Sequence, residues 1–291
     1  MRRFLCERLL TIQWGMNRNR VRIVLVETTH AGNIGAAARA MKTMGLADLA
    51  LVRPREYQTH ECYARASGAD DIIDNATVHT DLRSALEEAS WVIGTSARLR
   101  SLRWPQYDAR EAALQVGQHT GEGQVAVVFG RESSGLSNDE LARCSALLSI
   151  PAASEFGSLN LGAAVQVVSY EILMASKVEQ QRGIALQSGA HQPDKHQSDK
   201  HQSDKHQSDK QIDTSRPAAL EAPAVQRDLE HFYSHLADVM SQVDFLDKDN
   251  PRLLDGRLRR LFNRCGLLKT EVQLLRGFFS AIEKKMAGNK T

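Results

Sequence analysis

The segment VRIVLVETTHAGNIGAAARAMKTMGL, residues 21–46, decides the fold. Its apolar first part predicts a buried strand over Val21–Val26. The Ala-rich stretch that follows predicts a helix over Gly32–Met44, whose small side chains allow close packing against a sheet. A strand followed directly by such a helix is the opening unit of an α/β protein.

The same alternation continues along the chain. Further apolar strand candidates are Ala47–Val52, Trp91–Gly94, Val125–Phe129 and Ala146–Ile150. Helical patterns lie between and after them, including Asp81–Ala89, Asn138–Arg143 and Leu161–Val178. The alternation predicts an α/β fold with a mostly parallel sheet covered by helices on both faces.

Length and composition are those of a soluble protein. The 291 residues are 42% hydrophobic and 25% charged, which is ordinary for globular proteins and leaves room for one large domain and a small one. The formal net charge is only +2, and the sequence pI of about 8.4 allows a local basic surface without requiring one. The four cysteines have no short spacing, which favours reduced cytosolic thiols over a disulfide framework or a metal site.

The N-terminal extension does not resemble a targeting signal. Its first 15 residues carry three arginines around an apolar stretch that is too short and too interrupted for a signal peptide or a membrane span. Met16 is a second candidate for the native start. Elsewhere we expect no run that approaches the roughly twenty apolar residues that a bilayer requires. We therefore expect a cytoplasmic protein.

A low-complexity segment divides the chain. His191–Lys210 consists of HQPDK followed by three copies of HQSDK and contains no apolar residue, which predicts a disordered linker. The regularly spaced histidines are potential metal ligands, but repeat expansion in a tolerant linker produces the same pattern, and we favour the linker. The expected parts are a flexible extension (1–20), an α/β domain (21–182), the linker (183–224) and a helical domain (225–291).

Three amphipathic helices are predicted after the linker. Apolar residues recur at helical spacing in three groups: Leu229, Phe232, Tyr233, Leu236, Met240 and Val243; Leu254, Leu258, Leu261, Phe262 and Cys265; and Val272, Leu275, Phe279 and Ile282. The middle group is interspersed with Arg252, Arg257, Arg259, Arg260 and Arg264. These arginines suit phosphate contact, although a merely solvated helix face accounts for them equally well.

Three segments that follow predicted strands carry the residues of a candidate site, because open α/β sheets bind ligands at the carboxyl ends of their strands. In the first segment, Gly32 and Gly35 frame a turn into a helix N-terminus, which favours an anion. Asn33 and Arg39 are near enough to act on the same ligand. From spacing alone, an ordinary turn with a solvent-facing arginine is the better interpretation.

The second segment is VVFGRESSGL, residues 127–136, in which Gly130 allows close approach of the main chain to a ligand. The third is LLSIPAASEFGSLNLGAAVQVVSYE, residues 147–171, in which small residues open a helix and permit very close packing. The chain lacks the G-x-G-x-x-G pattern at its first turn and has no P-loop, so dinucleotide binding and nucleotide hydrolysis are disfavoured.

Taken together, the three segments resemble the SPOUT class of methyltransferases, in particular the TrmH-like RNA ribose 2′-O-methyltransferases. Asn33, Gly35 and Arg39 match the first motif, Phe129–Leu136 the second, and Ser158–Asn160 the third. Within that group, Gly94–Arg98 and the tail Leu258–Leu267 are similar to bacterial enzymes that modify the ribose of nucleotide 32 in the tRNA anticodon loop.

The resemblance implies a reaction and an assembly. Members of this group transfer a methyl group from S-adenosylmethionine to a ribose 2′-hydroxyl, which needs no metal. They are homodimers, and the C-terminal part of the catalytic domain forms a deep trefoil knot, a rare exception to unthreaded chain topology. An rRNA methyltransferase of the same group and an RNA-binding protein without catalysis are the alternatives.

The resemblance also assigns residues. Cofactor contacts are implied for Thr95, Ser96, Ala97, Gly130, Arg131, Glu132, Ile150, Gly157, Ser158 and Leu159. Catalytic roles are implied for Asn33, Arg39, Ser158 and Asn160, and RNA contacts for His30, Arg39, Arg257, Arg260 and Arg264. Because guanidinium is not normally deprotonated in proteins, we expect Arg39 to hold a phosphate and to stabilise negative charge on the ribose oxygen, with a base role left open.

Overall fold

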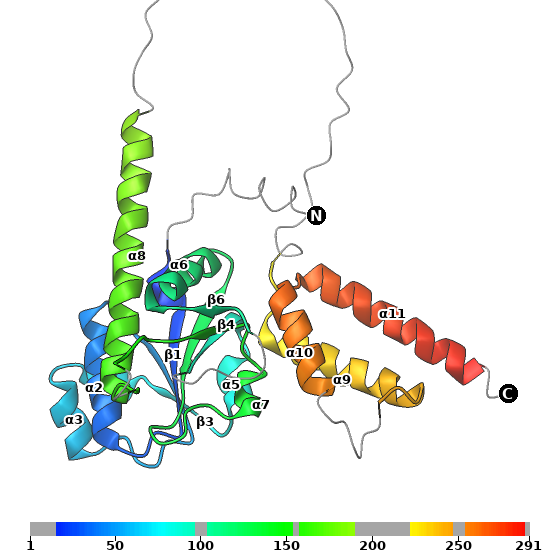
Figure 1. Ribbon diagram of the computed structural model, residues 1–291, viewed down its shortest axis with the longest axis horizontal. Helices are drawn as coiled ribbons and strands as arrows, with labels where there is room; N and C mark the ends of the chain where they lie inside the picture. The colour runs from blue at the N-terminus through cyan, green and yellow to red at the C-terminus, as the bar shows by residue number, and fades with distance from the viewer. Residues whose placement is uncertain (1–15, 97–103, 154–156, 190–221, 247–253, 289–291) are drawn as a thin grey trace, which may run out of the picture.

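The computed structural model describes residues 16–96, 104–153, 157–189, 222–246 and 254–288. These residues form an α/β domain followed by a helical domain (Figure 1). The N-terminal extension up to residue 15, the HQSDK repeats and the predicted site residue Ala97 lie outside the described residues.

A seven-stranded sheet forms the centre of the first domain. Its strands are β1 (Val21–Val26), β2 (Asp48–Val52), β3 (Thr77–His79), β4 (Ala89–Thr95), β5 (Gln106–Tyr107), β6 (Gln124–Phe129) and β7 (Ala146–Leu148). All neighbours pair in parallel, in the order β3-β2-β1-β6-β4-β7-β5. The predicted parallel α/β fold is confirmed, and β3 and β5, of three and two residues, are the strands for which no apolar run was found.

Helices cover both faces of the sheet (Figure 1). One face packs on α2 (Ala31–Thr43), α3 (His60–Ala66), α4 (Asp70–Asp74), α6 (Ala109–Thr120) and α8 (Leu161–Gly189). The other packs on α5 (Leu82–Leu86) and α7 (Asn138–Leu141). A short 3-10 helix, η1 (Arg18–Arg20), precedes β1. Residues of the central strands alternate between the two cores, as in β1, where Ile23 and Leu25 face the first core and Val24 and Val26 the second.

The long helix α8 differs from its prediction in two ways. It continues to Gly189, past both the expected helix end at Val178 and the expected domain boundary at residue 182. The apolar periodicity stops where α8 leaves the core, but the residues beyond it include good helix formers. Leu161–Val178 is also long and apolar enough to cross a membrane, contrary to our expectation, yet Val165, Val168 and Ile172 are buried in the domain core.

Glycines allow the first helices to pack closely. A Cβ added to Gly35 would lie 2.0 Å from the carbonyl oxygen of Cys62, and one on Gly162 would lie 2.7 Å from the Cβ of Ala36. The small residues that open α8 therefore lie against α2. The trefoil knot stays a prediction, because the connection from β7 to α8 includes residues 154–156, which are outside the described ranges.

The second domain contains α9 (Gln226–Gln242), α10 (Leu254–Cys265) and α11 (Lys269–Gly288), as the three apolar stripes predicted. Its core is centred on the buried Phe232, which stacks against Phe279 and meets Phe262 edge to face. Leu261 and Cys265, predicted to belong to the apolar stripe of α10, are exposed. The middle helix therefore presents a narrower apolar face than its sequence indicates.

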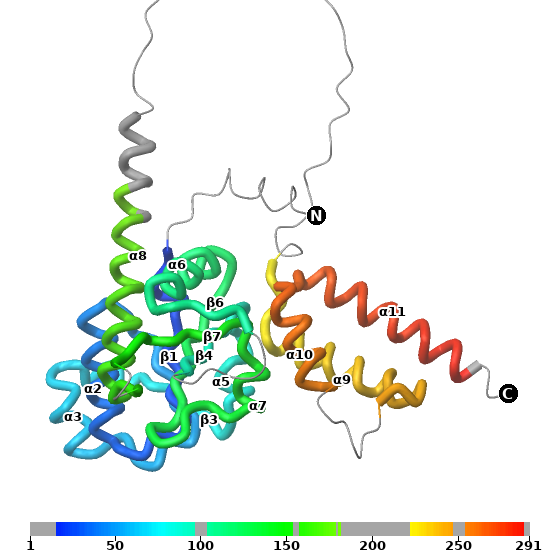
Figure 2. Tube along the Cα trace, in the orientation of Figure 1, coloured from blue at the N-terminus to red at the C-terminus, as the bar shows by residue number. Residues whose placement is uncertain are grey.

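The helical domain lies against the side of the α/β domain that carries α5 and α7 (Figure 2). Glu230 of α9 accepts hydrogen bonds from Arg143, which follows α7, and from Arg259 of α10. Asn263 donates to the carbonyl oxygen of Ala142 at 3.1 Å, and the amide of Arg227 to that of Glu87 at 3.1 Å. The two domains are thus joined by a defined polar contact as well as by the chain that links them.

Candidate functional site

A pocket of about 400 Å³ opens at the carboxyl ends of β4, β6 and β7, beside the start of α8. It is lined by Thr95, Ser96, Phe129, Gly130, Arg131, Glu132, Ser133, Ser134, Gly135, Leu136, Leu148, Ile150, Gly157, Ser158, Leu159, Leu161 and Ala164. The pocket lies at the carboxyl edge of the sheet, where parallel α/β folds bind ligands. Its volume is in the range of small-molecule sites.

The predicted cofactor residues surround this one pocket. All of those that the structure describes line it, whereas Ala97 is outside the described ranges. The additional lining residues, such as Phe129, Leu148 and Leu161, flank the predicted ones in the same segments. Only their position next to the predicted residues could have identified them from the sequence, because their residue types do not indicate a ligand.

The loop from Gly130 to Leu136 forms one wall of the pocket and is folded tightly on itself. The amide of Gly135 donates to the carbonyl oxygen of Arg131 at 2.9 Å, and Gly135 has a φ of +69°. A Cβ on Gly130 would lie 2.3 Å from the carbonyl carbon of Gly135. The glycines are needed for this turn, which presents main-chain groups to the pocket.

A chain of hydrogen bonds links the three site segments. Glu132 accepts from the amide and hydroxyl of Thr29 at 3.3 and 3.2 Å and from the Asn33 side chain at 3.0 Å. Asn33 Oδ1 accepts from Asn160 Nδ2 at 3.0 Å, and Asn160 Oδ1 accepts from the Gly162 amide at 2.9 Å. The structure thus brings together Asn33, Glu132 and Asn160, which are widely separated in the sequence.

The charge on Glu132 determines which groups donate and which accept in this series of hydrogen bonds. Partial burial acts to raise the pKa of Glu132, but the hydrogen bonds from Asn33 and Thr29 outweigh it, so that the pKa is lowered. An ionised Glu132 can only accept, which orients the Asn33 amide group toward it and leaves Asn33 Oδ1 to accept from Asn160.

Arg39 lies on α2 and His30 directly precedes this helix, but neither residue lines the pocket. Both side chains are exposed, and neither forms a hydrogen bond or an ion pair with another described residue. Ser158 and Asn160 are likewise exposed at the entrance to α8. Within one chain the structure therefore contains the pocket and the polar chain beside it, but does not bring Arg39 into the pocket.

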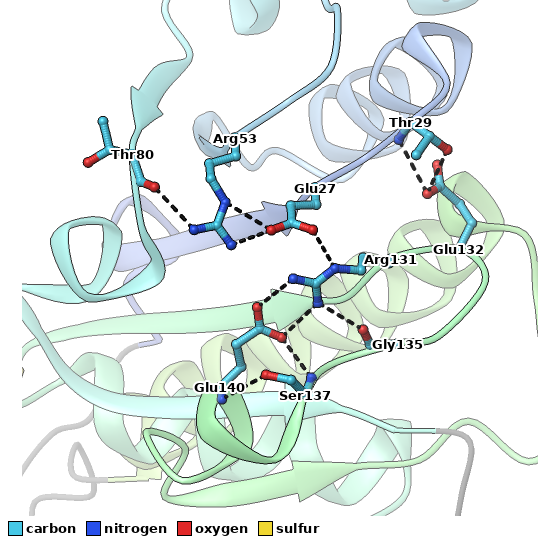
Figure 3. A network of polar contacts seen from close by, with 9 residues as sticks. All are labelled: Glu27, Thr29, Arg53, Thr80, Arg131, Glu132, Gly135, Ser137 and Glu140. Carbon is cyan, nitrogen blue, oxygen red and sulfur yellow. Dashed lines mark hydrogen bonds and ion pairs between the residues drawn. The ribbon is translucent and has the colours of Figure 1, made fainter.

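Arg131 lines the pocket, yet its guanidinium group is fully engaged elsewhere. Figure 3 shows it between the carboxylates of Glu27 and Glu140. A ligand in the pocket can therefore meet the main chain of Arg131 without disturbing that arrangement. Sequence reasoning did not find Glu27 or Glu140, because an acidic residue after a strand or in a helix cap is common.

The arginines of α10 divide into two kinds. Arg257 and Arg264 are exposed and have no polar partner among the described residues. Arg259 stacks over Tyr233 at 4.6 Å while it pairs with Glu230, and the Arg260 guanidinium lies 5.4 Å from the Trp104 ring. Of the predicted RNA-binding residues on this helix, Arg257 and Arg264 face solvent and Arg260 lies at the domain junction.

Comparisons with known proteins match both the α/β part and the helical part of the chain. Residues 20–170 match the SpoU rRNA Methylase family, and residues 227–291 match the C-terminal domain of the tRNA methyltransferase TrmJ. The chain is 44% identical to the Pseudomonas aeruginosa tRNA (cytidine/uridine/adenosine-2′-O-)-methyltransferase TrmJ over 93% of this chain and 96% of that protein. It is 40% identical to Escherichia coli K12 tRNA (cytidine/uridine-2′-O-)-methyltransferase TrmJ over 93% of this chain and 98% of that protein.

A solved structure extends the likeness to three dimensions. The crystal structure of TrmJ from Z. mobilis ZM4 superposes with a TM-score of 0.70 at 28% identity, and the match covers 90% of this chain and 98% of that one. Both domains therefore have counterparts in one solved protein.

Proposed function

The chain belongs to the SpoU methylase family, and we propose that it is an S-adenosylmethionine-dependent tRNA methyltransferase that methylates the ribose 2′-hydroxyl of nucleotide 32 in the anticodon loop. The match of residues 227–291 to the TrmJ C-terminal domain is the observation that favours tRNA over rRNA as the substrate. The first domain alone is compatible with either RNA. The cytoplasm is the compartment that this substrate implies.

The pocket fits S-adenosylmethionine in size and in chemistry. Its volume of about 400 Å³ suits a ligand of that size, and Phe129, Leu136, Leu148 and Ile150 provide apolar surface for an adenine ring. Thr95, Gly130 and Leu159 also line the pocket, and their main-chain groups would bind the ribose and the amino acid end of the cofactor. The cofactor supplies an electrophilic sulfonium methyl group.

The residues around the pocket would position the accepting ribose. Transfer of the methyl group requires in-line approach of the ribose oxygen and loss of its proton. Asn33 and Asn160, held by Glu132 and by the Gly162 amide, are oriented groups beside the pocket that would bind the ribose. Arg39 would bind the adjacent phosphate in a bidentate manner and stabilise negative charge as it develops on the oxygen.

We propose that the active enzyme is a homodimer in which Arg39 of one subunit acts at the pocket of the other. The supporting observation is a row of exposed apolar side chains, Tyr170, Met174 and Val178, at four-residue spacing on α8. Exposed apolar surfaces of this kind mark interfaces. Sedimentation of the Tyr170→Glu/Met174→Glu variant tests the assignment, because a variant that remains a dimer would exclude this surface.

Methyl transfer from labelled S-adenosylmethionine tests the function. Unmodified bulk tRNA and ribosomal RNA are offered separately, and the labelled nucleotide is mapped. Label on the ribose of nucleotide 32 of tRNA supports the full proposal, and label at another tRNA position corrects only the target. Label on ribosomal RNA alone would overturn the substrate, and cofactor binding without transfer to either RNA would favour a non-catalytic RNA-binding protein.

A further inference from the structure

Two neighbouring strands end in oppositely charged residues with unusual backbone conformations. Val26 of β1 pairs with Val52 of β2, so that Glu27 and Arg53 are the next residues along the two strands. Both have positive φ values, +48° and +46°, which non-glycine residues rarely adopt and which are retained where the surroundings require them. Arg53 donates to Glu27 from two nitrogens and to the carbonyl oxygen of Thr80 (Figure 3).

Glu27 also reaches across to the second site segment. Its other carboxylate oxygen accepts from Arg131 Nε at 2.5 Å. The hydrogen bond from Arg131 is the largest cause that lowers the pKa of Glu27 to about 2, with Arg53 contributing further and burial opposing. Glu27 is therefore a fixed negative charge between two arginines at neutral pH.

The remaining nitrogens of Arg131 bind on the opposite side. Nη1 and Nη2 donate to the two oxygens of Glu140 at 2.9 and 3.0 Å, a bidentate geometry, and Nη1 is also 3.4 Å from the carbonyl oxygen of Gly135. Glu140 is itself held by Ser137 in the capping box of α7 and is only 8% exposed. Arg131 thus connects the end of β1, its own loop and α7.

These contacts surround the loop that forms one wall of the pocket at the carboxyl ends of β4, β6 and β7. We call this pocket, where the methyl donor would bind, the donor pocket. All seven residues from Gly130 to Leu136 line that pocket, whereas Glu27, Arg53 and Glu140 do not. Arg131 and Gly135 close the loop through an antiparallel bridge, and the Arg131 side chain anchors it from behind. Without Glu27, the guanidinium group of Arg131 would keep only the contacts within its own loop and to α7.

We propose that Glu27 is a positioning residue for the methyl donor, which holds Arg131 and thereby keeps the 130–136 loop in the shape that binds S-adenosylmethionine. Glu27 does not line the pocket itself and would act only through Arg131. This assignment rests on the proposed function, because it takes the donor pocket as the S-adenosylmethionine site. Glu27→Gln should weaken donor binding about tenfold and leave the KM for tRNA within twofold of the wild type.

A matched control comes from the other end of the same two strands. Arg22 donates to both oxygens of Asp48 at 3.0 Å, which is an ion pair between β1 and β2 at the edge of the sheet away from the pocket. Asp48→Asn removes a comparable pair and should lower the melting temperature as much as Glu27→Gln does. Its dissociation constant for S-adenosylmethionine should equal that of the wild type.

Calorimetric titration of the full chain with S-adenosylmethionine tests the assignment, with Glu27→Gln, Arg131→Gln and the double variant compared. If Glu27 acts through Arg131, the double variant binds no more weakly than Arg131→Gln alone. Glu27→Asp, which retains the charge on a shorter side chain, should lie between the wild type and Glu27→Gln, and it provides the comparison if Glu27→Gln does not fold.

Three results would overturn the role of Glu27: donor affinity of Glu27→Gln or Glu27→Asp equal to that of the wild type, equal weakening by Asp48→Asn, or additive losses in the double variant. In each of them the wild type still binds the donor, so the proposed function stands. A wild-type protein that binds no S-adenosylmethionine would overturn the proposed function and this assignment together.

Discussion

The donor pocket and the domain junction contain similar ion-pair networks with the charges reversed. At the pocket, Arg131 lies between Glu27 and Glu140, and at the junction Glu230 lies between Arg143 and Arg259. The first network supports a glycine-containing loop and leaves a cavity in front of it. The second is packed between helices, with the central carboxylate 7% exposed, and closes the contact between two domains. The surroundings of a network therefore decide whether it shapes a site or joins two surfaces.

The comparison also separates arginines by their partners. Arg131, Arg143 and Arg259 are committed to carboxylates within the chain. Arg39, Arg257 and Arg264 are exposed and have no polar partner among the described residues, which leaves their guanidinium groups available to phosphate. The predictions below test whether this division corresponds to function.

The largest effect is expected at Arg39. Arg39→Ala should reduce methyl transfer to tRNA about a thousandfold, or about 4 kcal/mol, because it removes a cation that stabilises developing charge. Arg39→Lys should retain only a small part of the methyl-transfer activity that Arg39→Ala loses, because lysine cannot bind a phosphate in a bidentate manner. Single-turnover rates with bound donor measure this, and Arg65→Ala, which removes an exposed arginine on α3, is the control. A fully active Arg39→Ala variant would exclude the proposed role.

The next effect concerns the junction. Glu230→Gln should destabilise the protein by about 3 kcal/mol, because Arg143 and Arg259 lose the partner that neutralises them in a buried contact. Denaturant unfolding followed by tryptophan fluorescence reports on it, since Trp104 lies at the junction. Glu88→Gln, which removes the exposed partner of Arg227, should cost less than about 1 kcal/mol. Equal losses in both variants would show that the Glu230 network is not a structural link.

A smaller effect is expected from the free arginines of α10. The Arg257→Gln/Arg264→Gln variant should raise the KM for tRNA about tenfold and make binding less sensitive to salt, because phosphate contacts release counterions. Donor affinity should not change. Arg83→Gln, an exposed arginine on α5, serves as the charge control. If the double variant binds tRNA with the salt dependence of the wild type, these residues do not contact phosphate.

The smallest effect is a pH dependence of stability. The pKa of Glu27 is about 2 in the folded protein, against an ordinary value of 4.5. The stabilisation that ionised Glu27 gives the folded protein is therefore complete above pH 4.5 and is lost as the pH falls toward 2. A third of the Glu27 side chain is exposed, and solvent screening limits the contribution to about 1 kcal/mol. Melting temperatures of the wild type and Glu27→Gln should converge over this range. A constant difference would show that Glu27 does not titrate there.

Much of the fold and the site followed from local features of the sequence. The apolar run at Val21–Val26 and the Gly130 loop lie at the strand and pocket wall that they predicted. Gly32 and Gly35, predicted to frame a turn that favours an anion, instead lie buried inside α2, where the missing side chains allow close packing against α3. The sequence pattern did not predict the short strands β3 and β5, which have too few residues to show an alternation. It also did not predict the end of α8, because this helix continues beyond its apolar stripe.

The sequence by itself determined the α/β fold, the three terminal helices and the family resemblance, because periodicity and motif order are properties of neighbouring residues. Only the tertiary structure decided which charged groups meet. Arg259 and Arg257 are two residues apart on one helix, yet one is paired with Glu230 and the other is exposed. Glu27 and Arg131 are remote in sequence, and only the parallel pairing of β1 with β6 brings them together. Ion pairing depends on distance in space, which a local sequence pattern does not contain.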